Sequence, residues 1–218
     1  MKPSTYTIIV VALFLASLAF AVARDAGKAN ETLLRGTSAF EDMVDPALAK
    51  DDAGIAKALA AAEGQAAGVK EALGASASGQ YDRLVEAIRK GAAGKEYQAV
   101  AMNAVEVFRL LVDNVEAKGL KVPKEVSLLD YAGFRLRVLA AAPEADWVAM
   151  RKTVDDAARW WGAIESKVAE KGLRDAFNST IGGLQQAGKS ENLPMLRFAA
   201  QIDLDLVDLL EGVFERKK

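Results

Sequence analysis

The chain has 218 residues, a formal net charge of −2, and neither histidine nor cysteine. Without these two residue types it can form no Ser-His-Asp triad, no histidine-ligated haem, zinc or di-iron site, no disulfide, no thiolate nucleophile and no iron–sulfur cluster. The small acidic net charge gives no support for nucleic-acid binding, which requires a basic face, and we expect a non-enzymatic protein that needs no cofactor.

An apolar segment at the start of the chain predicts export from the cytoplasm. Residues 8–23 contain a single polar side chain, and the basic Lys2 precedes them. A basic residue followed by an apolar run, with small residues at Ala21 and Ala23, is typical of a secretory signal peptide cleaved after Ala23. Counted as residues 5–23, the segment is also long enough to cross a bilayer as a retained signal-anchor helix. Both interpretations place the remaining residues in the periplasm or the extracellular space, attached to the membrane only if the segment is not cleaved.

Apolar residues recur at alternating steps of three and four along most of the remaining chain, and strand signals are nearly absent. This spacing predicts an all-α helical bundle. The clearest run extends from Ile55 to Leu73, follows two aspartates that are candidate helix caps, and ends at Gly74. Similar runs predict helices at residues 26–44, 80–90, 97–115, 124–141, 147–168, 173–187 and 194–214. The predicted domains are residues 1–23 (signal peptide or signal anchor), 24–50 (N-terminal helix and linker) and 51–218 (helical bundle).

The chain shows signs of an internal repeat. A shift of 95 residues places the apolar positions of residues 55–73 on those of residues 150–168, and Ala93-Gly94-Lys95 falls on Ala187-Gly188-Lys189 at a shift of 94. This pattern indicates two duplicated three-helix units. The alternative is that any two helices with heptad spacing can be aligned in this way. The predicted repeats are residues 51–118 and 146–215, joined by a central helix at 124–141.

Residues 183–190, Gly-Leu-Gln-Gln-Ala-Gly-Lys-Ser, match the phosphate-binding formula G-x-x-x-x-G-K-[ST]. A true phosphate-binding loop joins a buried strand to a helix, whereas residues 177–184 have helical spacing. Only 28 residues follow the motif, too few for the rest of a nucleotide-binding sheet. We interpret Gly188 as part of a helix end and expect no nucleotide.

Carboxylates are the main acid–base groups that remain. Asp203 falls between Ala200 and Val207, on the predicted buried side of the last helix. A carboxylate in that position must be hydrogen-bonded, ion-paired or directed into a cavity. Pairing with Arg135 or Arg137 is the structural explanation, and a ligand contact is the functional one.

Aromatic side chains give the other candidates. Tyr131, next to Asp130, lies in the middle of the predicted helix 124–141. Trp160 and Trp161 are adjacent and therefore about 100° apart around a helix, so Trp161 continues the apolar seam and Trp160 lies at its margin. A marginal tryptophan can line an apolar pocket or contact a partner, although packing at the core edge is the simpler explanation. The candidate ligand-binding residues are Asp130, Tyr131, Trp160, Trp161 and Asp203.

These features predict a non-enzymatic, extracytoplasmic helical-bundle protein that binds a partner protein or a small apolar ligand between its helices. One alternative is a hard-cation site for calcium or iron, built from Asp203, Asp205, Asp208 and Glu211. A second is a membrane-anchored structural subunit. An enzymatic alternative would use Asp130 and Asp203 as a carboxylate pair.

Overall fold

The computed structural model describes the backbone of residues 5–216 and the side chains of residues 26–216. Within this range the protein is all-helical and has no strands, as predicted. The helices are α1 (Thr5–Ala49), α2 (Asp52–Gly94), α3 (Tyr97–Asp113), α4 (Lys124–Ala141), α5 (Trp147–Ile164), α6 (Lys171–Ser190) and α7 (Leu193–Arg216), with a short 3-10 helix, η1 (Glu165–Lys167), after α5.

The helix α2 consists of two helical halves joined at Gly74. This residue has φ 69° and ψ 178°, a backbone conformation that is essentially restricted to glycine. The predicted run that ends at Gly74 and the predicted helix that begins near residue 80 are therefore the two halves of α2. The first half begins at Asp51, whose side chain accepts hydrogen bonds from the amides of Ala53 and Gly54 at 3.1 Å, so the predicted aspartate cap is confirmed.

Gly74→Ala is expected to lower the free energy of unfolding by about 1–3 kcal/mol, because alanine is strained in this conformation. A Cβ atom at Gly74 would have no heavy atom within 4 Å, so the loss would come from the backbone alone. The matched control is Gly64→Ala in the first half of α2, where a Cβ also meets nothing but the conformation is helical. Urea denaturation of both variants measures the difference, and equal effects would contradict the assignment of strain to Gly74.

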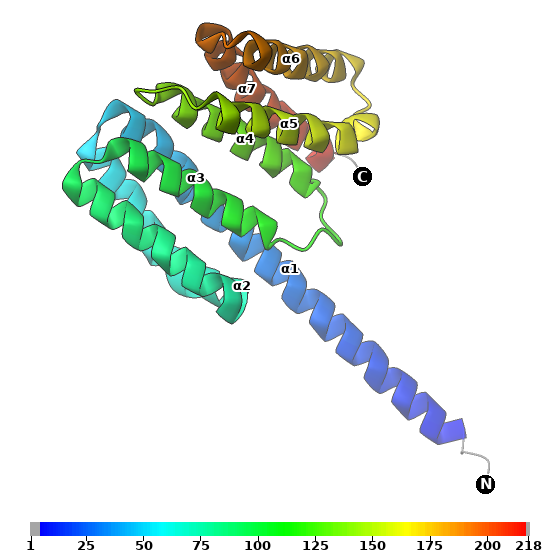
Figure 1. The fold of residues 1–218 in the computed structure, drawn as a ribbon. Coiled ribbons are helices and arrows are strands. Elements are labelled where there is room, and N and C mark those ends of the chain that lie inside the picture. The colour runs from blue at the N-terminus through cyan, green and yellow to red at the C-terminus, as the bar shows by residue number, and fades with distance from the viewer. Residues whose placement is uncertain (1–4, 217–218) are drawn as a thin grey trace.

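The helices form two four-helix units that lie side by side (Figure 1). The first contains α1, the two halves of α2, and α3, and the second contains α4, α5, α6 and α7. In each unit the first helix packs against the last, and helices that are consecutive in the chain also pack together. The units meet where α4 contacts α3 and α1, and a single hydrophobic core runs through both.

The predicted central helix corresponds to α4, which lies between the two units and contacts both of them. It touches α3 and α1 of the first unit and packs more extensively along α5 and α7, as the first helix of the second unit. It is buried around most of its circumference, including the neighbouring residues Leu128, Leu129, Tyr131 and Ala132.

In each unit, one glycine allows the first helix to approach its neighbours closely. A Cβ atom at Gly36 of α1 would lie 2.9 Å from Cγ2 of Val69 and 3.3 Å from Cδ1 of Leu111. A Cβ atom at Gly133 of α4 would lie 2.6 Å from Cδ2 of Leu204 on α7. Both positions are therefore closed to larger side chains unless a neighbour moves.

The N-terminal half of α1 projects beyond the other helices (Figure 1). Among the residues whose side chains are described, no helix is sufficiently long and apolar to cross a membrane. The predicted export segment, residues 1–23, lies outside those residues, so its function stays a prediction. At the other end of the chain, residues 183–190 lie within α6 and form no phosphate-binding loop.

Candidate functional site

A pocket of about 180 Å³ lies at the interface between the two units. Its walls come from α3 of the first unit and from α4 and α5 of the second. The volume suits a small organic molecule rather than a nucleotide or a lipid chain. The pocket is lined by Arg109 from α3, Tyr131 and Arg135 from α4, and Lys152, Thr153 and Asp156 from α5.

One arginine of the lining, Arg109, lies over two aromatic rings. The rings of Tyr131 and Trp160 meet edge to face, with their centroids 6.1 Å apart. The guanidinium carbon of Arg109 lies 4.8 Å from the centroid of the Trp160 ring and 5.1 Å from that of Tyr131. Both distances are within the range of cation–π attraction. The aromatic pair therefore helps to position the positive charge of Arg109 at the interface between the units.

A hydrogen-bonded network joins α3 to α4 beside Arg109. Nη1 of Arg135 donates to Oε1 of Glu106 at 2.6 Å and to the hydroxyl oxygen of Tyr131 at 2.5 Å. Burial, followed by the negative charge of Glu106, raises the pKa of Tyr131, so the phenol stays protonated at neutral pH. Nε of Arg135 is buried without a hydrogen-bond partner, which leaves this guanidinium with an unused donor.

Three basic side chains, Arg109, Arg135 and Lys152, line the pocket together with one carboxylate, Asp156. Two of them pair with carboxylates outside the lining, Arg109 with Asp113 at 2.7 Å and Arg135 with Glu106 at 2.6 Å. Asp156 is already engaged, since it accepts from Lys152 at 3.1 Å and from Arg159 at 2.7 Å. The guanidinium donors that these pairs leave open are the groups suited to bind an anion, above all a planar carboxylate.

The pocket contains two hydroxyl groups. That of Thr153 donates to the carbonyl oxygen of Ala149 at 2.9 Å. That of Tyr131 lies 3.5 Å from Oε1 of Glu106, the same carboxylate oxygen that accepts from Arg135.

A group of carboxylates surrounds another side of α4, where it meets α7 and α1. Asp203 of α7 is fully buried, and neither of its oxygens has a hydrogen-bond partner. Burial raises the pKa of Asp203 to about 8. Burial also raises the pKa of Asp130 well above its ordinary value, and the charges of Glu41, Glu211, Asp203 and Asp208 raise it further. We call Glu41, Asp130, Asp203, Asp208 and Glu211 the carboxylate cluster.

The structure brings the predicted ligand-binding residues together in two groups instead of one. Tyr131 lines the pocket and its ring packs against Trp160, whereas Asp130 and Asp203 belong to the carboxylate cluster. Trp161 lies in neither group. Its ring stacks on Phe177 with centroids 4.5 Å apart, and its Nε1 donates to Oδ1 of Asn178 at 2.7 Å, so it is a packing residue of the α5–α6 contact.

The predicted pairing of Asp203 with Arg135 or Arg137 is wrong. Arg135 pairs with Glu106 at 2.6 Å, and Arg137 pairs with Asp45 of α1 at 2.5 Å. The carboxylate partners of both arginines come from the first unit. Sequence spacing within α4 could not show this, since the pairing depends on how the two units meet.

The four residues of the predicted hard-cation site do not converge. Asp203 is buried, whereas Asp205, Asp208 and Glu211 are exposed, and Asp205 accepts a hydrogen bond from Gln201 at 2.9 Å. Within the part of the chain whose side chains are described, no group of three or more carboxylates is arranged to hold a metal ion. The geometry therefore gives this alternative no support.

Arg109 and Lys152 line the pocket but are absent from the predicted site residues. Arg109 does carry a signal in the sequence, because it is the one charged residue within residues 107–112, and the other five are all buried. A charge inside such a run needs polar or aromatic partners close by. Lys152 carries no comparable signal, since it lies on an ordinary polar helix face.

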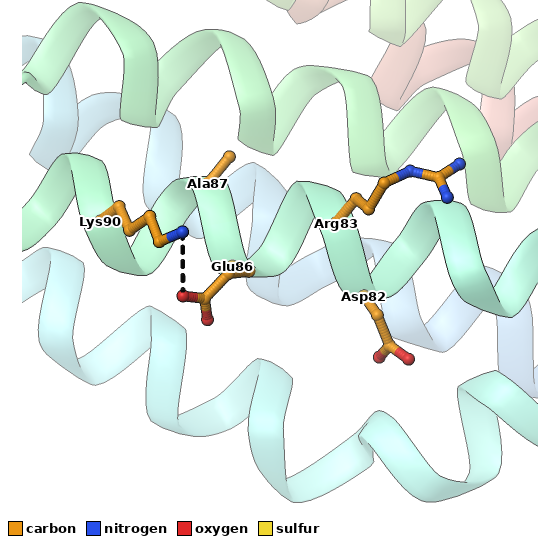
Figure 2. Close-up of a pocket in the computed structure, with 5 residues that line it drawn as sticks. All are labelled: Asp82, Arg83, Glu86, Ala87 and Lys90. Carbon is orange, nitrogen blue, oxygen red and sulfur yellow. Dashed lines mark ion pairs between the residues drawn. The ribbon is translucent and has the colours of Figure 1, made fainter.

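Two other hollows in the described part of the protein have a different character. A groove of about 760 Å³ lies near the C-terminal ends of α1 and α4 and is lined mainly by apolar residues, including Leu48, Met102 and Leu139. Figure 2 shows an open depression on α2 that is lined by five residues of this one helix. Its two acidic and two basic side chains balance in charge, and Lys90 pairs with Glu86 at 3.7 Å, so it has no surplus charge for a ligand.

Neither the comparison with protein-family models nor the comparisons with curated proteins and with solved structures found a match to this chain.

Proposed function

We propose that this protein is a non-enzymatic binding protein whose ligand is a small organic anion, held in the pocket between the two helical units. The observation that carries the proposal is the position of Arg109, which lies over Tyr131 and Trp160 and lines the pocket together with Arg135. The positive lining favours an anionic ligand over the purely apolar one that the sequence predicts. The ring of Tyr131 in the lining favours a ligand with an apolar or unsaturated body next to its carboxylate.

Because both units contribute to the pocket, a bound ligand would stabilise the contact between them. The first unit supplies Arg109, and the second supplies Arg135 and Lys152. A ligand that bridges these charges binds the assembled chain but not the unfolded one, and it raises stability in proportion to its saturation.

We propose further that residues 1–23 direct export and that residues 5–23 stay in the membrane as an anchor. The proposal is supported by the continuity of α1, which runs from Thr5 to Ala49. The helix that would cross the membrane is then the same helix that enters the bundle. This places the bundle outside the cytoplasm, where it can meet a small anion or a partner protein.

We also infer that the two units arose by duplication. The inference is supported by their common order of four helices, with the first packed against the last, and by the glycines at Gly36 and Gly133 in the first helix of each unit. On this view α4 corresponds to the C-terminal half of α1, and the repeat contains four helices instead of three.

Thermal unfolding of the full chain in detergent, with a panel of small mono- and dicarboxylates and of uncharged apolar compounds, tests the ligand proposal. At one hundred times its Kd, a ligand adds about 2.7 kcal/mol, which corresponds to a rise in Tm of about 5–10 °C for a chain of this size. We expect such a rise for one or more carboxylates and expect Arg109→Gln or Arg135→Gln to abolish it.

Arg83→Gln is the matched control, because Arg83 is exposed on α2, where it lines the open depression of Figure 2, and is not part of the pocket at α3, α4 and α5. It should leave the ligand-induced rise in Tm unchanged. Stabilisation by apolar compounds alone, insensitive to Arg109→Gln, would contradict the anion proposal. It would favour the larger apolar groove at Leu48, Met102 and Leu139 as the binding site.

A further inference from the structure

The connection between α3 and α4 lies beside α1, at the end of the bundle from which the N-terminal half of α1 projects (Figure 1). Asn30 of α1 is buried. Its side chain donates to the carbonyl oxygen of Glu116 and accepts from the amide of Glu116, both at 2.8 Å. These two hydrogen bonds fix the position of the connection along α1, next to Asn30.

This end of the bundle carries unpaired lysines. Residues 114–124 contain three lysines and a single acidic residue, Glu116, and a fourth lysine lies on α1 two residues before Asn30. Among the residues that the structure describes, none of these four lysines has an ion-pair partner, whereas Lys70 and Lys152 pair with aspartates. The four form what we call the lysine surface: Lys28, Lys118 and Lys121, which are exposed, and Lys124, which is partly buried.

The distance of the lysine surface from the apolar run of α1 places it near the surface of the membrane. The apolar run of α1 ends at Ala23, and Asn30 lies seven residues further along the same helix. At 1.5 Å per residue, this separation is about 10 Å. The polar headgroup layer of one leaflet is about 5–8 Å thick. With residues 5–23 across the bilayer, the connection pinned at Asn30 therefore lies next to the headgroups.

We propose that the lysine surface binds the anionic headgroups of the membrane that holds the α1 anchor. The inference rests on the anchor stated under the proposed function. Lysine ammonium groups bind lipid phosphates as point charges, and this attraction acts only within about a Debye length of the surface, about 8 Å at physiological salt. The contact would fix the orientation of the bundle on the membrane.

The test uses the full chain in nanodiscs of neutral phosphatidylcholine, or of phosphatidylcholine mixed with anionic phosphatidylglycerol. A water-soluble amine-reactive reagent labels exposed lysines, and mass spectrometry gives the labelling rate at each site. We expect Lys118 and Lys121 to label several-fold more slowly in the anionic discs. The exposed lysines Lys57, Lys90 and Lys189 on α2 and α6 should label at the same rate in both lipids.

A charge-reversal variant supplies the second arm. In Lys118→Glu/Lys121→Glu/Lys124→Glu, the remaining Lys28 is expected to lose its lipid-dependent protection, whereas Lys57→Glu/Lys90→Glu/Lys189→Glu should retain it. If the chain is embedded in both kinds of disc and the lysine surface labels at the same rate in both lipids, this inference is overturned. The proposal that residues 5–23 anchor the chain is then unaffected. Release of the chain from vesicles by alkaline carbonate overturns the anchor and, with it, this inference.

Discussion

Asp203→Asn is expected to raise the free energy of unfolding at pH 7 by about 2–4 kcal/mol and to flatten its dependence on pH. The carboxyl of Asp203 is fully buried without a hydrogen-bond partner, and its pKa is raised to about 8. The unfolded chain gains stability by ionising this group, whereas the folded chain must keep it protonated. Asparagine removes the difference, although its amide is also left without a partner, which offsets part of the gain.

The sign of the pH effect follows from the raised pKa. Between the unfolded value near 4 and the folded value of about 8, the folded state binds more protons than the unfolded state. The stability of the native chain should therefore fall as the pH rises through this window and level off above pH 8. The pKa of Asp130 is also raised, so the stability of the variant should keep part of this dependence on pH.

Urea denaturation between pH 5 and pH 9 measures this slope for the native chain and for Asp203→Asn. Asp205→Asn is the matched control, because Asp205 is exposed two residues away on the same helix. It should leave the slope unchanged. Identical slopes for the native chain and Asp203→Asn would show that Asp203 is not desolvated as described.

Gly133→Ala is expected to lower the free energy of unfolding by about 1–3 kcal/mol, since it overpacks the contact between α4 and α7. The added Cβ would lie 2.6 Å from Cδ2 and 2.7 Å from Cγ of Leu204, and 3.2 Å from Oδ2 of Asp203. Neither side chain can move into solvent, because both are buried.

Gly162→Ala on α5 is the matched control for this substitution. A Cβ at Gly162 meets no heavy atom within 4 Å, so the higher helix propensity of alanine should raise stability by about 0.5–1 kcal/mol. Thermal and urea unfolding of the two variants should thus move in opposite directions. A stabilising Gly133→Ala would mean that α4 and α7 are further apart than the structure places them.

The helices themselves were predictable because their apolar spacing and their breakers are local properties. Gly74 and Asp51 mark the ends of helical segments in the sequence, and both do so in the structure. The sequence could not show that α4 packs mainly on α5 and α7, because the apolar pattern of a helix does not say which neighbours it meets. That choice depends on contacts between residues about 70 apart, such as Gly133 with Leu204.

The candidate site shows the same division between local and non-local information. The buried position of Asp203 was predicted from its place between Ala200 and Val207, and the structure confirms it. Its lack of a partner could not be predicted, because the two candidate arginines are taken by Glu106 and Asp45 of the first unit. The pocket could be predicted only in part. Tyr131 was a candidate in the sequence, whereas the basic residues of the lining come from three helices whose packing the sequence does not show.

The separation into two units also has a consequence for how the chain folds. Apart from its contacts with α4, the first unit makes its main helix–helix contacts among α1, α2 and α3. These contacts join helices that are neighbours in the chain or the two ends of one unit, and short sequence separations favour rapid folding. The N-terminal unit can therefore complete most of its core while the second unit is still being synthesised. The later helix α4 then finds a preformed surface on α3 and α1 against which it can fold.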